Sequence, residues 1–228
     1  MKDSNLNLKI ATFKDLLLVR TLESGEKMIN ISNTLKNCIC IYQQSDMFLY
    51  VGNDLWVRES VANKLQKIAD NLKKSYPELF LKVVYGFRHP EIQEFYFIRR
   101  KNSLKLVNKN MGEETLNELV NTMTAYPETA GHPTGGAVDI TICTENNELD
   151  MGTRISDFSD PEKIKTYCDY LNNEQKRNRK ILHDLMVSEE FAPYYGEWWH
   201  FSFGDKEWAF FYSKPCAIYG KIDFRIDS

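Results

Sequence analysis

The sequence predicts an α+β fold in which helices flank a small, mostly antiparallel sheet. Strand-like and helical patterns do not alternate regularly along the chain, which disfavours a parallel α/β sheet. The 228 residues contain no internal repeat and no Pro/Gly/Ser-rich linker, and a chain of this length can bury one large core. We therefore expect a single domain over residues 1–228. Residues 1–45 have no assigned task and form an N-terminal extension, as a lid over a site or as a dimer contact that would allow a homo-oligomer.

Elements in the first half of the chain follow from local patterns. Residues 37–51 hold two short β-rich runs around a polar turn. Residues 55–72 place apolar side chains at helical spacing, with Asn53 or Asp54 as the cap and Pro77 just past the end. These patterns predict strands followed by a long amphipathic helix.

The middle of the chain predicts one strand and two helices. The run "LKVVYGF", residues 81–87, is typical of a buried strand. The segment "RHPEIQEFYFIRRKN" predicts a helix with Pro90 in its first turn, where a missing N–H costs nothing. Residues 113–124 predict another helix.

The last third of the chain predicts a strand, a helix and an aromatic-rich end. "GAVDITI", residues 136–142, predicts a strand with Asp139 and Thr141 on one face and three β-branched residues on the other. Residues 160–190 are expected to be helical, with "KRNRK" at 176–180 as a solvated face. "EWWHFSFGDKEWAFFY" predicts a strand, a turn at Gly204–Asp205 and an aromatic-rich return.

Composition and charge exclude several classes of protein. Hydrophobic residues make up 43% and charged residues 27%, as in ordinary soluble globular proteins. The net charge of −3 gives no reason to expect nucleic acid or an anionic membrane as partner. The five scattered cysteines do not suggest a disulfide framework, and Cys38 and Cys40 are expected to serve packing. The first 20 residues lack a signal peptide's apolar core, so we expect a cytoplasmic protein.

Two histidines and two acids form a candidate metal site. His132 precedes a glycine turn, and Asp139 then follows inside an apolar strand, where an unpaired carboxylate would be costly. His200 lies three residues after Glu197 in "EWWH". A catalytic zinc ion uses three protein ligands and one open position, and His132, Asp139 and His200 supply such a set. Glu197 is then the spare carboxylate that can act as a base.

Each of these residues also has an ordinary structural interpretation. A loop histidine can simply form hydrogen bonds, a strand aspartate can satisfy backbone amides, and the aromatic residues around His200 can be core. The two spacings, seven and three residues, are odd, so a flat strand would separate each pair. A shared site therefore requires His132 on the loop before the strand and Glu197 at a bend, which Gly135, Gly136 and Gly196 allow.

The motifs resemble a known family of zinc peptidases. "HPTGGAVDIT" fits His-x-x-Gly-x-Ala-x-Asp, "GEWWHFSFGD" fits Glu-x-Trp-His, "YGFRHPEIQ" fits Gly-x-Arg-x-x-x-x-Gln, and "DMGTRISDF" is similar to a Met-Gly-Ser/Thr stretch. In order and interval they resemble the D-alanyl-D-alanine dipeptidases of the vancomycin-resistance type, within the wider group of zinc D,D-peptidases and hedgehog-like domains. The resemblance runs from about residue 48 to 212.

The resemblance implies a fold and a division of roles. It implies a hedgehog/D,D-peptidase-like fold and one Zn²⁺ per chain on His132, Asp139 and His200. It implies Glu197 as general base and acid for a metal-activated water, and Arg88 as the cation that stabilises the oxyanion. His89 and His183 match no role of the family and are expected at the surface.

Two positions depart from the family pattern. Ala130 stands where the family usually has a serine, and Ser156 stands where it usually has an aspartate, with Asp157 displaced by one residue. In the family both residues help to hold the substrate's amino group. We assign substrate contacts to Ser156, Asp157 and Trp198, and we expect specificity for D-alanyl-D-alanine to be altered.

The sequence thus predicts a zinc metallopeptidase whose substrate is D-alanyl-D-alanine or a closely related D,D-dipeptide. One alternative is a zinc D,D-carboxypeptidase or L,D-peptidase that acts on cell-wall peptides. The other is a zinc-binding domain that has lost catalysis.

Overall fold

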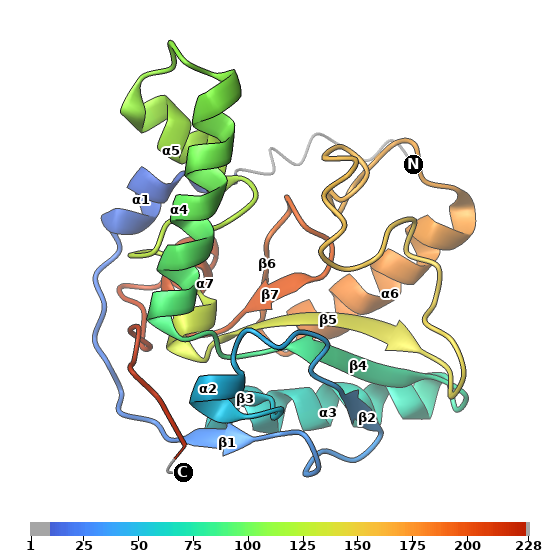
Figure 1. Ribbon diagram of the computed structural model, residues 1–228. Coiled ribbons are helices and arrows are strands. Elements are labelled where there is room, and N and C mark those ends of the chain that lie inside the picture. Colours follow the sequence, from blue (N-terminus) through green and yellow to red (C-terminus); the bar gives the residue numbers. More distant parts are fainter. Residues whose placement is uncertain (1–9, 227–228) are drawn as a thin grey trace.

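A computed structural model describes residues 10–226 and confirms the predicted fold class (Figure 1). The main sheet has five strands in the order β2-β4-β5-β7-β6, and only the β2–β4 pair within it is parallel. These strands are β2 (Cys38–Cys40), β4 (Phe80–Tyr85), β5 (Ala137–Cys143), β7 (His200–Ser202) and β6 (Ala192–Pro193). A separate antiparallel pair joins β1 (Met28–Asn30) to β3 (Trp56–Arg58).

Two long helices cover one face of the main sheet. They are α3 (Glu59–Ser75) and α6 (Asn173–Ser188), which pack on β4, β5 and β6. Apolar side chains of α3, such as Leu65 and Ile68, share one buried cluster with Val138 and Ile140 of β5. Burial of this apolar surface is the main driving force for the fold.

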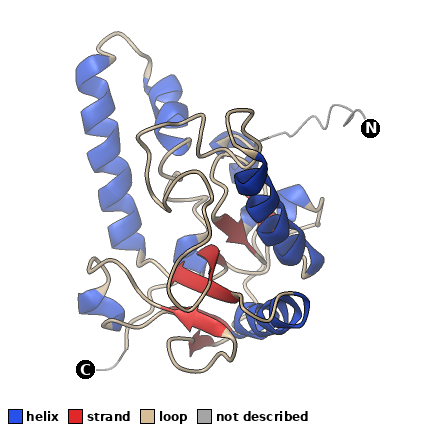
Figure 2. Ribbon diagram, turned by 90° about the vertical axis from the view of Figure 1, so that its right-hand side faces the viewer, coloured by secondary structure: helices blue, strands red, loops and turns tan. Residues whose placement is uncertain are grey.

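The other face of the sheet lies under a pair of helices that stand away from the rest. They are α4 (Pro90–Val107) and α5 (Glu113–Asn121), which rise together above the sheet in Figure 1 and form one edge of the molecule in Figure 2. The remaining helices are short: α1 (Phe13–Leu17), α2 (Phe48–Val51), α7 (Lys206–Phe211) and a 3₁₀ turn at His132–Thr134. Since Asp139 points away from the apolar cluster, it faces the side on which α4 stands.

Several predicted elements need correction. The second β-rich run of residues 37–51 is wrong, because Phe48–Val51 is helical. The long helix begins at Glu59 with Arg58 as its cap, so neither Asn53 nor Asp54 caps it. Trp56–Arg58 instead pairs with β1, and this pairing overrides the helical spacing of the preceding side chains. The return after Gly204–Asp205 is the helix α7, which the Asp205 side chain caps by accepting from the Trp208 N–H.

The predicted helix over residues 160–190 is confirmed only from Asn173 onward. Residues 160–172 form turns, and the backbone carbonyls of Lys163 and Lys165 accept hydrogen bonds from Arg179 instead of from a following helical turn. Arg179 also donates to the carbonyl of Met151 at 2.7 Å. The "KRNRK" run is therefore not wholly solvated, because Asn178 and Arg179 are buried.

The expectation that His89 lies at the surface is wrong. His89 is 1% exposed, stacks on Tyr50 with 4.1 Å between ring centroids, and forms a 2.8 Å hydrogen bond to Asp223 through Nε2. Its Nδ1 accepts from the Glu91 N–H, so His89 caps α4. His183 is a partly exposed residue of α6 whose ring lies beside Tyr167.

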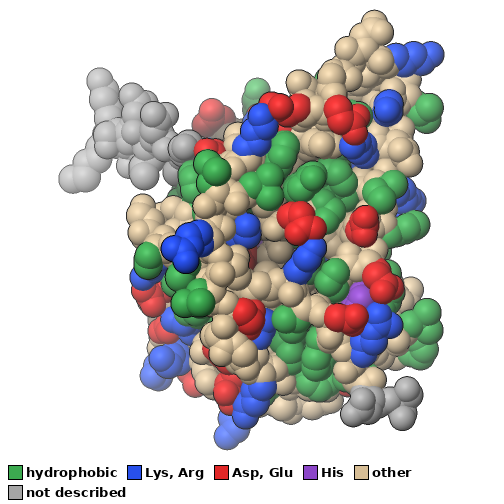
Figure 3. All heavy atoms as spheres, turned by 90° about the vertical axis from the view of Figure 1, so that its left-hand side faces the viewer, with side chains coloured by type: hydrophobic (Ala, Val, Ile, Leu, Met, Phe, Trp, Pro, Cys, Tyr) green, Lys and Arg blue, Asp and Glu red, His purple; other side chains and the backbone are tan. Residues whose placement is uncertain are grey.

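Charged side chains of both signs are interspersed on the face shown in Figure 3. None of the helices formed by residues 10–226 combines the length and the apolar character needed to cross a bilayer.

Candidate metal and active site

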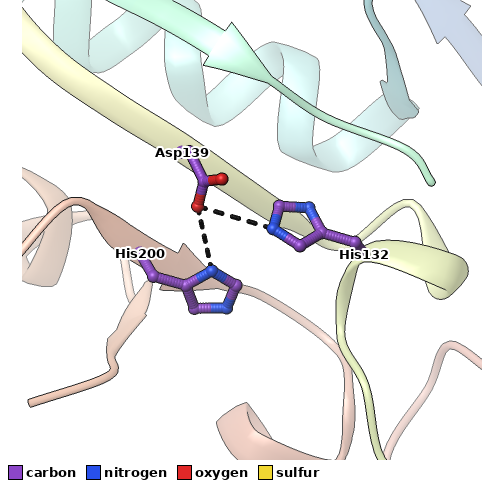
Figure 4. Close-up of side chains that lie close together, drawn as sticks. All are labelled: His132, Asp139 and His200. Atoms are coloured by element: carbon purple, nitrogen blue, oxygen red, sulfur yellow. Dashed lines mark hydrogen bonds and ion pairs between the residues drawn. The ribbon is translucent and has the colours of Figure 1, made fainter. Parts of the chain in front are cut away.

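Three side chains from two neighbouring strands and a turn converge at one point (Figure 4). Asp139 lies in β5, His200 lies opposite it in β7, and His132 lies in the 3₁₀ turn that precedes β5. Asp139 Oδ1 is 3.0 Å from His200 Nδ1 and 3.4 Å from His132 Nε2. One ligand atom from each residue lies within 4.8 Å of the others, so the group can hold a metal ion.

The turn that carries His132 depends on two glycines. Gly135 has a φ of +74°, a conformation that favours glycine. A Cβ on Gly136 would lie 2.4 Å from the carbonyl oxygen of Phe203. The buried Arg58 side chain donates to the Thr134 carbonyl at 2.8 Å and fixes the turn from the other side. His132 therefore lies on the loop before the strand, as the odd spacing required.

The Gly86 carbonyl orients His132 through the ring nitrogen that would not bind the metal. His132 Nδ1 is 2.7 Å from the Gly86 carbonyl, which can only accept, so this nitrogen carries the proton and Nε2 is free to bind. His200 turns Nδ1 toward Asp139, and its Nε2 lies 3.9 Å from a Glu207 carboxylate oxygen. Such outer partners fix the tautomer of a ligand histidine.

Burial and mutual charge shift the pKa values of this cluster. Burial alone would raise the pKa of Asp139, but the two histidines outweigh it and lower that pKa well below the usual range. Burial lowers the pKa of His132, whereas the hydrogen bond to Asp139 overcomes burial at His200 and raises its pKa to about 9. Asp139 therefore stays ionised, and its carboxylate is available to bind a cation.

Glu197 lies at a bend beside the three candidate ligands. Its backbone N–H donates to the Tyr194 carbonyl at 3.1 Å, and its own carbonyl accepts from the His200 N–H at 3.2 Å. Its carboxylate has no hydrogen-bond partner within residues 10–226. Burial, with help from Asp139 and Glu207, raises the pKa of Glu197 to about 8. A carboxyl group with such a pKa is suited to proton transfer near neutral pH.

Arg88 follows β4 and lines the same cavity. Its Nε–H donates to the Tyr85 hydroxyl at 3.1 Å, and its Nη1–H donates to Gln93 Oε1 at 2.8 Å. Burial alone would lower the pKa of Arg88, but Tyr85, Asp139 and Asp46 outweigh it and raise that pKa above its ordinary value. Arg88 is thus a fixed cation in the wall of the site.

The cavity has a volume of about 500 Å³ and includes the whole cluster. Its wall contains Arg88, His132, Asp139, Glu197 and His200, and it continues along α4 as far as Ser103. Three residues of the N-terminal region, Ala11, Leu16 and Gln44, also line it. The N-terminal region thus contributes to the cavity wall, and residues 1–9 lie outside the described part of the chain.

The three predicted substrate contacts lie in different places. Ser156 lines the cavity, whereas the carboxylate of Asp157 accepts from the Ser159 N–H within its own loop at 3.1 Å. Trp198 is buried and its indole N–H donates to Thr153 Oγ1 at 2.9 Å. Its neighbour Trp199 is the tryptophan that lines the cavity.

Sequence reasoning missed Glu207. It lines the cavity in the first turn of α7, and burial raises its pKa to about 7. The signal was available, because Asp205 followed by Lys206 and Glu207 is a typical helix start. It was missed because the segment after Gly204–Asp205 was expected to be an aromatic-rich return and not a helix.

Comparisons with known proteins agree with the motifs. The family model described as D-ala-D-ala dipeptidase, peptidase M15, matches residues 49–218. A curated D-alanyl-D-alanine dipeptidase of Synechocystis sp. is 33% identical over 108 residues, which cover 40% of this chain and 44% of that protein. The chain thus matches less than half the length of this relative.

Three solved structures show a more remote likeness. A variant of the vancomycin-resistance D,D-pentapeptidase VanY with Zn(II) is 17% identical, with a TM-score of 0.42, over 74% of this chain and 84% of that one. VanYB in complex with D-alanine-D-alanine is 17% identical, with a TM-score of 0.44, over 89% and 94%. The LdcB LD-carboxypeptidase is 18% identical, with a TM-score of 0.47, over 86% and 79%. Because the family model matches more than half of its residues, the chain belongs to the D-ala-D-ala dipeptidase family of peptidases.

Proposed function

We propose that this chain is a zinc dipeptidase that hydrolyses D-alanyl-D-alanine or a closely related D,D-dipeptide. The observation that carries the proposal is the convergence of His132, Asp139 and His200 beside a carboxylate, Glu197, that has no hydrogen-bond partner within residues 10–226. Family membership and the curated dipeptidase relative support the choice of substrate.

The donor set suits zinc. Two imidazole nitrogens and one carboxylate oxygen, with no thiolate, are typical ligands of a catalytic zinc ion that keeps one position open. When bound, the ion supplies Lewis-acid chemistry, polarising a carbonyl group and making water more acidic. One ion per chain is expected.

Glu197 is proposed to move the proton. A carboxylate with a raised pKa beside the metal ligands can take a proton from the attacking water and then deliver it to the departing amine. Arg88 supplies a fixed positive charge where the carbonyl oxygen becomes negative. Glu197 thus handles the proton of the attacking water, and Arg88 stabilises the negative charge on the carbonyl oxygen.

Only some of the residues assigned to substrate binding line the cavity. Ser156 lies at the cavity wall, and Ala130 lines it where the family usually has a serine. Asp157 and Trp198 would require a shift of the loop over residues 153–159 to reach a bound dipeptide. We therefore propose D,D-dipeptides as the substrate class and do not restrict the substrate to D-alanyl-D-alanine.

The length of the cavity supports a second candidate, a D,D-carboxypeptidase acting on longer cell-wall peptides. Gln93 and Ser103 both line the cavity, and the helix between them rises about 15 Å. An extended dipeptide spans only about 7 Å. Comparing free D-alanyl-D-alanine with peptides that end in the same two residues separates these candidates. A zinc domain without catalysis is the third candidate, and the presence of Glu197 and Arg88 in one cavity weighs against it.

The test is release of D-alanine by purified protein. We expect turnover of D-alanyl-D-alanine by the zinc-loaded protein, loss of turnover with a chelator and recovery after zinc is restored. Hydrolysis only of longer peptides would favour the carboxypeptidase, and no hydrolysis by zinc-loaded protein would favour the non-catalytic domain. A cytoplasmic location and a homo-oligomer remain predictions from the sequence.

A further inference from the structure

Arg88 contacts two tyrosines that are both anchored by one carboxylate. The guanidinium lies over the rings of Tyr85 and Tyr96, 4.5 and 5.5 Å from their centroids. The hydroxyls of these two tyrosines donate to the same oxygen of Asp46, at 2.8 and 2.7 Å. Since Arg88 Nε–H also donates to the Tyr85 hydroxyl, a chain of hydrogen bonds runs from Arg88 through Tyr85 to Asp46.

A third tyrosine fixes the carboxylate itself. The Tyr42 hydroxyl donates to the second oxygen of Asp46 and accepts from the Met47 N–H at 2.8 Å. Burial is the largest cause that raises the pKa of Tyr96 to about 12, and it raises the pKa values of Tyr42 and Tyr85 as well. The three phenols therefore stay protonated and donate their O–H groups to the Asp46 side chain.

The opposite side of the guanidinium is also held. Arg88 Nη1–H donates to Gln93 Oε1, and Gln93 Nε2–H in turn donates to the Ala125 carbonyl at 2.8 Å. These contacts occupy one N–H on Nε and one on Nη1, so the other N–H groups of the fork have no partner within residues 10–226. Because Arg88 lines the cavity, those donors can serve a substrate oxygen.

We propose that Asp46 is a positioning residue that holds Arg88 in the geometry needed to stabilise the transition state. The inference rests on the proposed function, in which Arg88 stabilises the oxyanion. Asp46 does not itself line the cavity, so it acts through Tyr85 and Tyr96. It precedes residue 49, where the family match begins, so a segment outside the matched region completes the site.

The kinetic test is a double-mutant cycle with a D,D-dipeptide. Asp46→Asn should lower kcat about 10- to 100-fold and leave KM within about two-fold, because the misplaced cation affects the transition state more than the ground state. In an Arg88→Gln background the same substitution should change kcat less than about two-fold. An equal loss of kcat in both backgrounds would overturn the proposal, because Asp46 would then act independently of Arg88.

Asp70→Asn is the matched control. Asp70 is a half-buried residue of α3 whose carboxylate accepts from Asn37 and Gln66, both at 3.0 Å, and it lies outside the cavity. Its substitution should leave kcat unchanged. Melting temperatures of both Asn variants show whether a loss of kcat merely follows a loss of stability.

A second readout does not depend on activity. In protein labelled with ¹⁵N-arginine, the Arg88 Nε–H signal, assigned by its loss in Arg88→Gln, should exchange slowly with water in the wild type and much faster in Asp46→Asn. An unchanged exchange rate would overturn the proposal. If Asp46→Asn does not fold, Tyr96→Phe removes one hydrogen bond to Asp46 while keeping the Tyr85 acceptor of the Arg88 Nε–H, and it should also accelerate the exchange. A wild type that hydrolyses no D,D-dipeptide refutes the proposed function, while this signal still decides the role of Asp46.

Discussion

Asp139 and His200 are register partners in the antiparallel pair formed by β5 and β7, with Asp139 Oδ1 3.0 Å from His200 Nδ1. Directly opposed residues of such a pair place their side chains on the same face, about 5 Å apart at Cβ. The sheet itself therefore sets the spacing of two candidate ligands. The turn before β5 then brings in His132, and the bend before β7 brings in Glu197.

His200→Ala should abolish metal binding. The remaining pair, His132 and Asp139, offers only two ligand atoms, too few for a tight zinc site. Elemental analysis of the purified variant should find zinc near zero, against about one ion per chain in the wild type. His183→Ala is the control, because His183 lies on α6 outside the cavity, and it should retain the full zinc content. A full equivalent of zinc in His200→Ala would contradict the ligand assignment.

Glu197→Gln should retain zinc and fold but lose turnover. The amide keeps the size of the side chain and cannot take a proton, so kcat should fall about 10²- to 10⁴-fold. Steady-state assays with D-alanyl-D-alanine measure the loss, with Glu174→Gln, an exposed residue of α6, as control. Near-wild-type turnover in Glu197→Gln would assign the proton transfer to another group, such as Glu207 in the cavity wall.

Arg88→Lys should impair kcat although it keeps the positive charge. A lysine lacks the planar guanidinium that donates to both the Tyr85 hydroxyl and Gln93. Its ammonium group would therefore not be held in a fixed position. Removing one oriented donor to an oxyanion typically lowers kcat about 10²- to 10³-fold. Comparing kcat and KM of the variant with those of wild type tests this. A change confined to KM would mean that Arg88 binds the ground state instead.

Gly136→Ala should destabilise the fold around the metal site. The added Cβ would lie 2.4 Å from the Phe203 carbonyl oxygen and 3.0 Å from Thr134 Oγ1, so the backbone must move, at a cost of about 1–3 kcal/mol. Thermal unfolding should show a lower Tm, and zinc should bind more weakly because the same turn carries His132. Gly220→Ala, whose Cβ would make only ordinary contacts of 3.4 Å or more, should melt like the wild type. Equal melting temperatures for the two variants would contradict this account.

Elements with a strong local pattern could be predicted from the sequence. Elements whose bounds depend on contacts with distant segments could not. A buried apolar run predicted β4, and proline at the first position predicted the start of α4. The start of α3 was missed because Trp56–Arg58 is recruited by β1, a pairing that no local pattern shows. The turns over 160–172 were missed because Arg179 binds their carbonyls from a later segment.

The candidate ligands could be proposed from the sequence because an aspartate inside an apolar strand is unusual and because the motifs around His132, Asp139 and His200 resemble those of the family. The supporting residues could not be found in the same way. Asp46 reaches Arg88 through Tyr85 and Tyr96, and the loop that contains it precedes the motifs in the sequence. Which of Trp198 and Trp199 faces the cavity depends on the bend at Glu197, which rotates the chain just before β7.

The most direct test of the account is D-alanine release measured on protein of known zinc content. We predict that the wild type contains one zinc ion per chain and steadily hydrolyses D-alanyl-D-alanine. We predict that His200→Ala loses both the zinc ion and the activity. A zinc-free wild type that still hydrolyses the dipeptide, or a zinc-loaded wild type that hydrolyses neither the dipeptide nor longer peptides ending in D-alanyl-D-alanine, would contradict it.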